Sequence, residues 1–260
     1  MIPLLSLQHV SKEYGSPEEM HVAGGVTRAL HDISFDIRRG EFVCMVGPSG
    51  GGKSTLLRLI AGLIHPTAGH IYLDGEEITG PSPRVGIVFQ NVNLMPWRTV
   101  LDNVALPLEL AGQPRPARYS VALELIDLVA LNGFEYHYPH QLSGGMQQRA
   151  AIARTLAHDP EILLLDEPFG ALDALTRERL NRELLQIHQL KHPTIFMVTH
   201  AINEAVFLAD RVLVLSRRPG VLRCDIPIPL PRPRGPELFT QPQYLALVSQ
   251  VRAAIDETES

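Results

Sequence analysis

The sequence predicts an α/β protein with a mainly parallel sheet at its core, an N-terminal antiparallel β subdomain and an inserted helical subdomain. Apolar runs of strand length recur along the chain and alternate with helical segments, which is typical of parallel strands covered on both faces. These runs lie at 42–46, 85–89, 162–166 and 194–198. Between about 91 and 156 such runs disappear and apolar residues adopt helical spacing, which indicates the helical subdomain.

The composition is that of a globular protein with a large core, since 45% of the 260 residues are hydrophobic. The net charge of −5 gives no general attraction to nucleic acid or anionic lipid, so we expect any membrane association to depend on a protein partner. The sequence shows no apolar stretch long enough to span a membrane and no secretory signal, which predicts a cytoplasmic protein. We interpret Cys44 and Cys224 as small hydrophobic residues.

The first eighty residues are expected to form short strands, because apolar and polar residues alternate there and Asp74-Gly75 marks a tight turn. The expected strands are 6–14, which ends at Tyr14, then 30–37 after an exposed loop at 16–27, then 42–46 and 70–73.

The remainder of the chain alternates helices and strands once the helical region has ended. The expected elements are strand 162–166, a helix through Leu180 to Ile187, strand 194–198, helix 202–209, strand 211–216, a Pro-rich connector at 226–236 and a terminal helix at 243–257. We therefore predict a main domain of 1–235, with the helical insertion at about 91–156, and a helical extension of 236–260.

Residues 47–55 read Gly-Pro-Ser-Gly-Gly-Gly-Lys-Ser-Thr and fit the phosphate-binding pattern G-x-x-x-x-G-K-[ST]. The segment lies between an apolar strand and a good helix former, which is the context that the pattern requires. Glycines let backbone N–H groups surround an anion, and the following helix adds its positive dipole end. Lys53 is expected to reach the outer phosphates and Ser54 to offer its hydroxyl to Mg²⁺. The plain alternative is a glycine-rich turn. The predicted nucleotide-binding residues of this loop are Gly47, Pro48, Ser49, Gly50, Gly51, Gly52, Lys53, Ser54 and Thr55.

Two adjacent carboxylates, Asp166 and Glu167, end the apolar run at 162–166. Open parallel sheets bind their ligands at the carboxyl ends of strands, so this is the expected place for catalytic acids. Asp166 is expected to orient Mg²⁺ or its water shell, and Glu167 to position or deprotonate a water that attacks the terminal phosphate. The alternative is a pair of solvated acids.

Residues 142–149 read Leu-Ser-Gly-Gly-Met-Gln-Gln-Arg and predict a helix start capped by Ser143. Gly144 and Gly145 leave the first N–H groups accessible, which would make a second anion site. A simple capped helix is the alternative, but paired glycines weaken a first helical turn, and this favours the approach of a ligand or backbone.

Taken in order with Gln90, Ala171-Leu172-Asp173 and His200, these motifs resemble the ATPase subunits of ATP-binding-cassette transporters, from Leu5 to about Ser216. The resemblance implies that Tyr14 stacks on adenine, that Gln90 contacts Mg²⁺ and the attacking water, that His200 contacts the terminal phosphate, and that Asp173 lies in a loop at a dimer interface. Taken alone, each of these residues has a plainer explanation in strand-end packing or helix capping.

The resemblance also implies a homodimer in which two ATP molecules are sandwiched between subunits. The segment of Ser143, Gly144, Gly145 and Gln147 would then act in trans, on ATP held by the phosphate loop of the second subunit. The implied cofactors are ATP and Mg²⁺. The implied catalytic residues are Glu167, His200, Lys53 and Gln90, and the implied Mg²⁺-binding residues are Ser54, Gln90 and Asp166.

A finer resemblance, to the nitrate, sulfonate and taurine importers, comes from residues 94–100, 213–220 and 226–233. It implies an ATPase at the cytoplasmic face of the inner membrane that powers uptake of a small anion, such as an aliphatic sulfonate, taurine or nitrate. The implied partners are transmembrane permease subunits and, indirectly, a periplasmic or extracellular solute-binding protein. Gly51 stands where relatives often carry Cys, a difference that we expect to have no consequence for a backbone cradle.

Two other classes share the phosphate loop. A chromosome or DNA-repair ATPase requires a long coiled coil between the loop and Ser143, and no sustained heptads occur there, so no nucleic-acid partner is expected. A phosphate-loop kinase is the other alternative, and residues 142–148 together with Glu167 argue against it.

Overall fold

The structure is a computed structural model that describes residues 3–15 and 27–257. Most of the predicted loop at 16–27 lies outside the described residues. The chain divides into two units, residues 1–82 with 194–260, and residues 83–193. The predicted division between 1–235 and 236–260 stays a prediction.

The first unit contains an antiparallel sheet in the order β2-β1-β4-β5. Strand β1 pairs with both of its neighbours, so that Leu5 lies opposite Ile37 of β2 and opposite Leu73 of β4. Leu5, Leu7 and Val10 are buried, as the apolar alternation predicts. The strands are β1 (Leu5–Tyr14), β2 (Thr27–Ile37), β4 (Ala68–Leu73) and β5 (Glu76–Glu77).

The same unit contains four strands of a second sheet in the order β10-β9-β3-β8. The central strand β3 (Phe42–Val46) is parallel to β8 (Thr194–Val198) and to β9 (Arg211–Leu215), and β10 (Leu222–Pro227) is antiparallel to β9. Every residue of β3 and β8 is buried, which explains their continuous apolar sequence.

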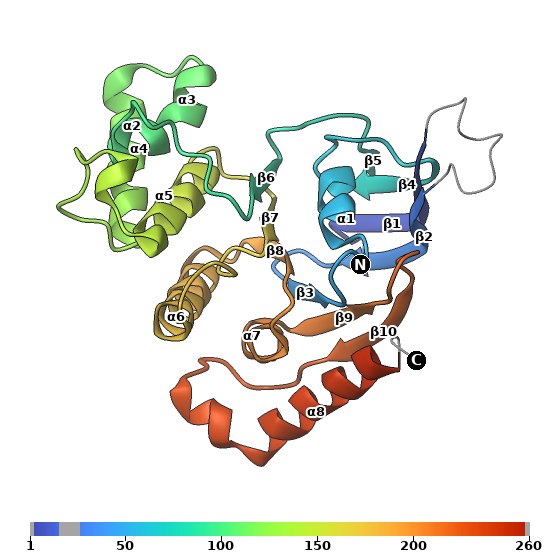
Figure 1. The fold of residues 1–260 in the computed structure, drawn as a ribbon. Coiled ribbons are helices and arrows are strands. Elements are labelled where there is room, and N and C mark those ends of the chain that lie inside the picture. The colour runs from blue at the N-terminus through green and yellow to red at the C-terminus, as the bar shows by residue number, and fades with distance from the viewer. Residues whose placement is uncertain (1–2, 16–26, 258–260) are drawn as a thin grey trace. The chain divides into compact units, whose positions relative to one another are not determined.

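Three helices belong to this unit: α1 (Lys53–Ile60), α7 (Ile202–Leu208) and α8 (Pro242–Asp256). The short helix α7 packs against β3 and β9. The terminal helix α8 packs against α7, β9 and β10 and follows the 3₁₀ helix η3 (Pro236–Thr240). Figure 1 shows α8 in red alongside α7 and β10.

In the second unit, β6 (Val85–Val88) and β7 (Ile162–Asp166) are parallel, with Val88 opposite Leu165. Between 91 and 156, all of which the structure describes, the chain forms helices and turns and no strand, in agreement with the helical spacing of its apolar residues. The bounds of the predicted helical insertion stay a prediction. Its core includes Leu101, Val104 and Ile126. The helices of the unit are α2 (Val100–Val104), α3 (Leu106–Leu110), α4 (Arg115–Leu128), η2 (Pro139–Gln141), α5 (Gly144–Leu156) and α6 (Ala174–Lys191).

Both cysteines are free thiols, Cys44 buried in β3 and Cys224 half-buried in β10. No helix within 3–15 and 27–257 has the length and apolarity that a membrane span requires.

Candidate functional site

The phosphate-binding sequence forms the loop between β3 and α1, as predicted. Gly52, immediately before α1, has a φ of 99°, and a Cβ there would lie 2.7 Å from Leu30 Cδ2. A Cβ at Gly47 would lie 2.4 Å from the Leu215 carbonyl oxygen. These two glycines therefore allow the loop to lie directly against β2 and the end of β9, which a side chain at either position would prevent.

The buried Lys53 side chain folds back over this loop. Its ammonium donates hydrogen bonds to the carbonyl oxygens of Gly47 at 2.8 Å and Pro48 at 3.0 Å. Among the described residues no side chain caps α1, so the first turn of the helix offers its N–H groups and dipole to an anion. The loop, the lysine and the helix end together form a cradle for phosphate groups.

Gly51 is more constrained than the sequence suggested. A Cβ at Gly51 would lie 2.7 Å from the Ser216 carbonyl oxygen and 3.2 Å from that of Pro48. A side chain at this position would displace the turn that follows β9, because both neighbours are backbone atoms. The expectation that this glycine has no consequence for the cradle stays a prediction, and the structure adds that this chain leaves no room for a side chain at position 51.

The turn at 216–220 packs closely against the phosphate loop. Gly220 exchanges backbone hydrogen bonds with β2, its N–H donating to Ala29 and its carbonyl accepting from His31, both at 2.9 Å. A Cβ at Gly220 would lie only 2.2 Å from the Gly51 carbonyl oxygen. The Pro219-Gly220 pair, next to a strand, was the available signal for a close backbone approach.

His200 follows β8, which is parallel to β3, so His200 and Gly47 lie at the same carboxyl edge of the sheet. The N–H of Thr199 continues the strand pairing by donating to the Met45 carbonyl at 3.1 Å. Tyr14 is the last residue of β1 and is 41% exposed, so its ring is open to contact. The adenine contact of Tyr14 stays a prediction.

The second unit brings another group of predicted residues together. Because β6 and β7 are parallel, Gln90 and the pair Asp166 and Glu167 lie at one carboxyl edge. Asp166 is buried, and Glu167 has a φ of 44° in the left-handed region. Six other non-glycine residues among those described share this conformation, so it does not by itself mark a functional side chain.

The segment at 142–149 begins α5 as predicted, with Ser143 Oγ accepting from the Met146 N–H at 3.3 Å. Gly144 is exposed, whereas Gly145 is buried against α6, where a Cβ would lie 3.0 Å from Thr176 Cγ2. Close packing of α5 on α6 is thus a sufficient reason for Gly145. The approach of a ligand is a separate possibility for the exposed Ser143 and Gly144.

Two other residues of this group have structural partners. The side-chain amide of Gln147 donates to the carbonyls of Pro139 at 2.9 Å and Leu142 at 3.3 Å, so it holds the segment before α5. Asp173 caps α6 by accepting from the Thr176 N–H at 3.0 Å, and this contact with Thr176 lowers the pKa of Asp173. Their roles in trans stay predictions.

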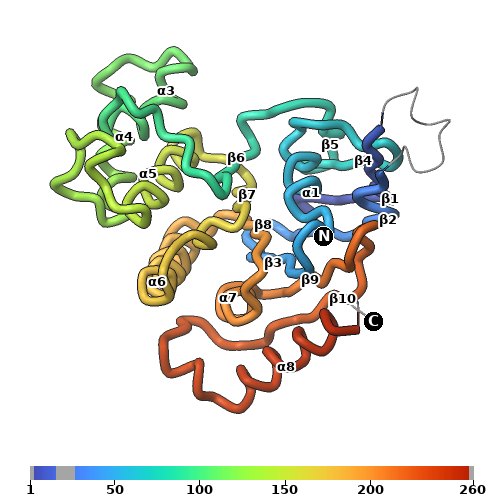
Figure 2. The backbone as a smooth tube through the Cα atoms, viewed as in Figure 1, coloured from blue at the N-terminus to red at the C-terminus, as the bar shows by residue number. Residues whose placement is uncertain are grey.

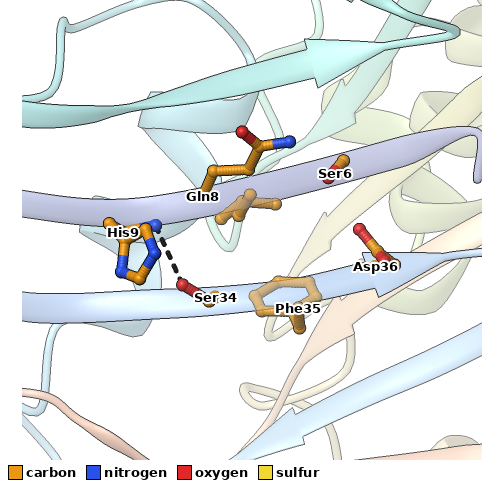
Figure 3. A pocket seen from close by; sticks show the side chains of 7 residues that line it. Ser6, Gln8, His9, Ser34, Phe35 and Asp36 are labelled. Carbon is orange, nitrogen blue, oxygen red and sulfur yellow. Dashed lines mark hydrogen bonds between the residues drawn. The ribbon is translucent and has the colours of Figure 1, made fainter.

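The first unit also has an open groove on β1 and β2, away from these motifs. It is lined by Ser6, Leu7, Gln8, His9, Ser34, Phe35 and Asp36. Figure 3 shows its exposed polar side chains and the 2.8 Å hydrogen bond from the His9 N–H to Ser34 Oγ. His9 Nδ1 lies 2.8 Å from the carboxylate of Asp32, which is not among the residues that line the groove. We assign it no role.

The geometry agrees with the comparisons with known proteins. Residues 30–170 match the family described as ABC transporter, and the chain therefore belongs to this family, whose cassettes are ATP-binding, ATP-hydrolysing transport ATPases. A nitrate import ATP-binding protein, NrtD of Synechocystis sp., is 52% identical over 80% of this chain and 78% of its own length. A taurine import ATP-binding protein, TauB of Yersinia pestis, is 53% identical over 74% of this chain and 75% of its own length. The expected resemblance to this group of importers is confirmed.

A similar solved structure is a dimeric post-hydrolysis state of the ATP-binding cassette MJ0796 with bound ADP and phosphate. It has a TM-score of 0.74 and 35% identity, and the match covers 86% of this chain and 98% of that one. The predicted α/β fold of a phosphate-loop ATPase is thereby confirmed.

Proposed function

We propose that this chain is the ATPase subunit of an importer for a small anion, and that it acts as a homodimer bound to a permease at the cytoplasmic face of the membrane. One observation carries the proposal: each unit places a complementary set of ATPase residues at the carboxyl edge of its own parallel strands. The phosphate cradle and His200 belong to one set, and Gln90, Asp166 and Glu167 to the other.

In this proposal, the loop at 47–55 binds the phosphates of ATP through its N–H groups and the start of α1. Lys53 exchanges the carbonyls of Gly47 and Pro48 for the outer phosphates, which offer it opposite charge. Little covalent chemistry is needed from the protein, since positioning and charge stabilisation account for most of phosphoryl-transfer catalysis.

The remaining residues act on the metal and the attacking water. The hydroxyl of Ser54, the amide of Gln90 and the carboxylate of Asp166 supply the hard oxygen ligands that Mg²⁺ prefers. When bound, Mg²⁺ neutralises charge on the transferring group. Glu167 orients the water and accepts its proton, and His200 contacts the terminal phosphate. The position of Glu167 directly after the carboxyl end of β7 supports this role.

The second subunit supplies the exposed start of α5, where Ser143 and Gly144 face solvent. Its N–H groups and dipole suit the terminal phosphate of an ATP bound to the other chain. The similar cassette MJ0796 is a dimer, which supports the assembly of two chains.

The second unit also has a surface suited to a permease. Trp97 is 72% exposed and Tyr136 is 75% exposed, both unusual for a side chain of their size. The loop of Trp97 is held by Asn103, whose amide donates to the carbonyls of Met95, Arg98 and Thr99 at 3.0–3.1 Å. An exposed tryptophan on a rigid loop suits a protein interface, because little entropy is lost on binding.

Reconstitution tests the proposal. The protein is assembled in vesicles with its permease and binding protein, and ATP hydrolysis is followed as nitrate, taurine, an alkanesulfonate or a sugar is added. We expect stimulation by one of the anions, and its loss in Trp97→Ala, with ATP affinity unchanged. Leu190→Ala, at a leucine 70% exposed on α6, is the control and should keep the stimulation. Stimulation by the sugar alone would contradict the proposal.

A further inference from the structure

The C-terminal segment packs against the short helix that begins just after His200. Helix α7 (Ile202–Leu208) begins two residues after His200 and is short, and among the described residues no side chain caps its start. A helix of this length has little stability of its own, so its position depends on what packs against it. On one side it packs against β3, and on another against α8.

Two arginines of the Pro-rich segment satisfy the carboxyl end of α7. Arg234 Nη1 donates to the carbonyls of Phe207 at 2.9 Å and Ala209 at 2.8 Å, with Val206 at 3.4 Å. Arg232 Nη2 donates to the Leu208 carbonyl at 2.9 Å. These carbonyls are among those that a helix end leaves without a partner, and the positive charges also complement the helix dipole.

The Arg234 side chain is buried, with a relative exposure of 1%. Burial lowers the pKa of its guanidinium to about 10, so it remains charged at neutral pH. Its second amino group donates to the Leu230 carbonyl at 3.1 Å, which ties the Pro-rich segment to the helix. A buried arginine that spans two backbone segments is costly to replace, because no lysine has the same planar set of donors.

The segment from 236 to 256 holds the other face of α7. Tyr244 is buried, and its hydroxyl donates to the Asn203 carbonyl in the first turn at 2.9 Å. The ring of Phe239 stacks on Phe207 with centroids 5.0 Å apart, and it meets Tyr244 edge-on at 5.5 Å. Figure 2 shows this part of the chain passing α7 after β10 and turning back as α8.

The start of α7 is in turn connected to the residue beside His200. Thr199 Oγ1 donates to the buried Glu204 carboxylate at 2.6 Å and accepts from the Ala201 N–H at 3.1 Å. The backbone on both sides of His200 is therefore fixed to α7, and a shift of the helix moves it.

We propose that Arg234 and Tyr244 are positioning residues for His200, which they hold in place through α7. The C-terminal segment thereby becomes part of the hydrolytic apparatus without touching the nucleotide. This inference rests on the proposed contact of His200 with the terminal phosphate. It assigns a function to side chains that the ATPase motifs do not include.

The test uses the full-length protein with Arg234→Lys and Tyr244→Phe, each with and without His200→Ala. Single-turnover hydrolysis, with protein in excess, gives the chemical rate, and a fluorescent ATP analogue gives the affinity. We expect Tyr244→Phe, which loses one hydrogen bond, to lower the rate about fivefold, and Arg234→Lys, which loses several, to lower it at least as much. Both substitutions should leave affinity unchanged. In the His200→Ala background the same substitutions should have no further effect. Arg252→Lys, on the exposed face of α8, is the matched control.

The outcomes separate the two proposals. Equal proportional losses with and without His200 would overturn the positioning role, because a merely structural effect is independent of His200. A full rate in both Arg234→Lys and Tyr244→Phe would overturn it as well. A full rate in His200→Ala would instead overturn the proposed role of His200 and, with it, this inference.

Discussion

Glu167 combines a left-handed backbone with a position at the end of a buried strand, next to the buried Asp166. Glu167 is half-buried, whereas Asp166 is buried. Asp166 is buried, and a nearby cation would stabilise the negative charge of a buried carboxylate. At the scale of the residue, the two carboxylates therefore differ in environment, as their proposed roles require.

Replacing Glu167 by glutamine tests the role of its charge. The amide keeps the shape of the side chain but cannot accept a proton, so we expect hydrolysis to fall at least about 100-fold while ATP binding is retained. Phosphate release and the fluorescent ATP analogue measure the two properties. Glu124→Gln, at an exposed glutamate of α4, should behave as wild type. Hydrolysis by Glu167→Gln within twofold of wild type would exclude the role.

At the scale of the element, the turn at 216–220 and the phosphate loop form one packed layer. Gly220→Ala places a Cβ 2.2 Å from the Gly51 carbonyl oxygen, so the loop must shift. We expect ATP affinity to fall about tenfold or more, since close overlap in a packed site costs about 1–3 kcal/mol. Gly80→Ala is the control, because a Cβ there meets nothing within 4 Å. Isothermal titration calorimetry measures the ATP affinity of both variants. Equal affinities would contradict the predicted effect of the close packing at Gly220.

Local pattern was enough to predict the buried strands. The apolar runs at 42–46, 162–166 and 194–198 match β3, β7 and β8 within a residue. A strand that is buried on both faces needs apolar side chains at successive positions, and such a run is visible in the sequence. The phosphate loop, Glu167 and the start of α5 were likewise located from spacing. Each of these features is set by residues close together in the chain.

Features that depend on distant contacts could not be predicted. The spacing of Arg234 does not show that it reaches the end of α7, some twenty-five positions earlier in the chain. Gly145 looked like a ligand contact until its packing on Thr176 was visible. Gly51 looked unconstrained because its neighbour, Ser216, comes from the turn after β9. In each case the tertiary fold brings the contacting residue close, and the local sequence does not indicate the contact.

For the whole molecule, we predict that hydrolysis needs two chains. We assign the phosphate loop and the exposed start of α5 to two halves of one ATP site, each from a different subunit. Lys53→Ala damages the loop half, and Ser143→Arg places a bulky cation in the α5 half. Each variant alone is therefore expected to be inactive as a homodimer.

Mixing these two variants tests the claim most directly. In a mixed dimer, the intact loop of the Ser143→Arg chain faces the intact α5 segment of the Lys53→Ala chain, so one complete site is restored. We predict that ATP hydrolysis reappears on mixing, up to about a quarter of the wild-type rate, because half of the dimers are mixed and each has one intact site of two. Full activity in Ser143→Arg alone, or no recovery in a mixture shown to contain mixed dimers, would contradict the account.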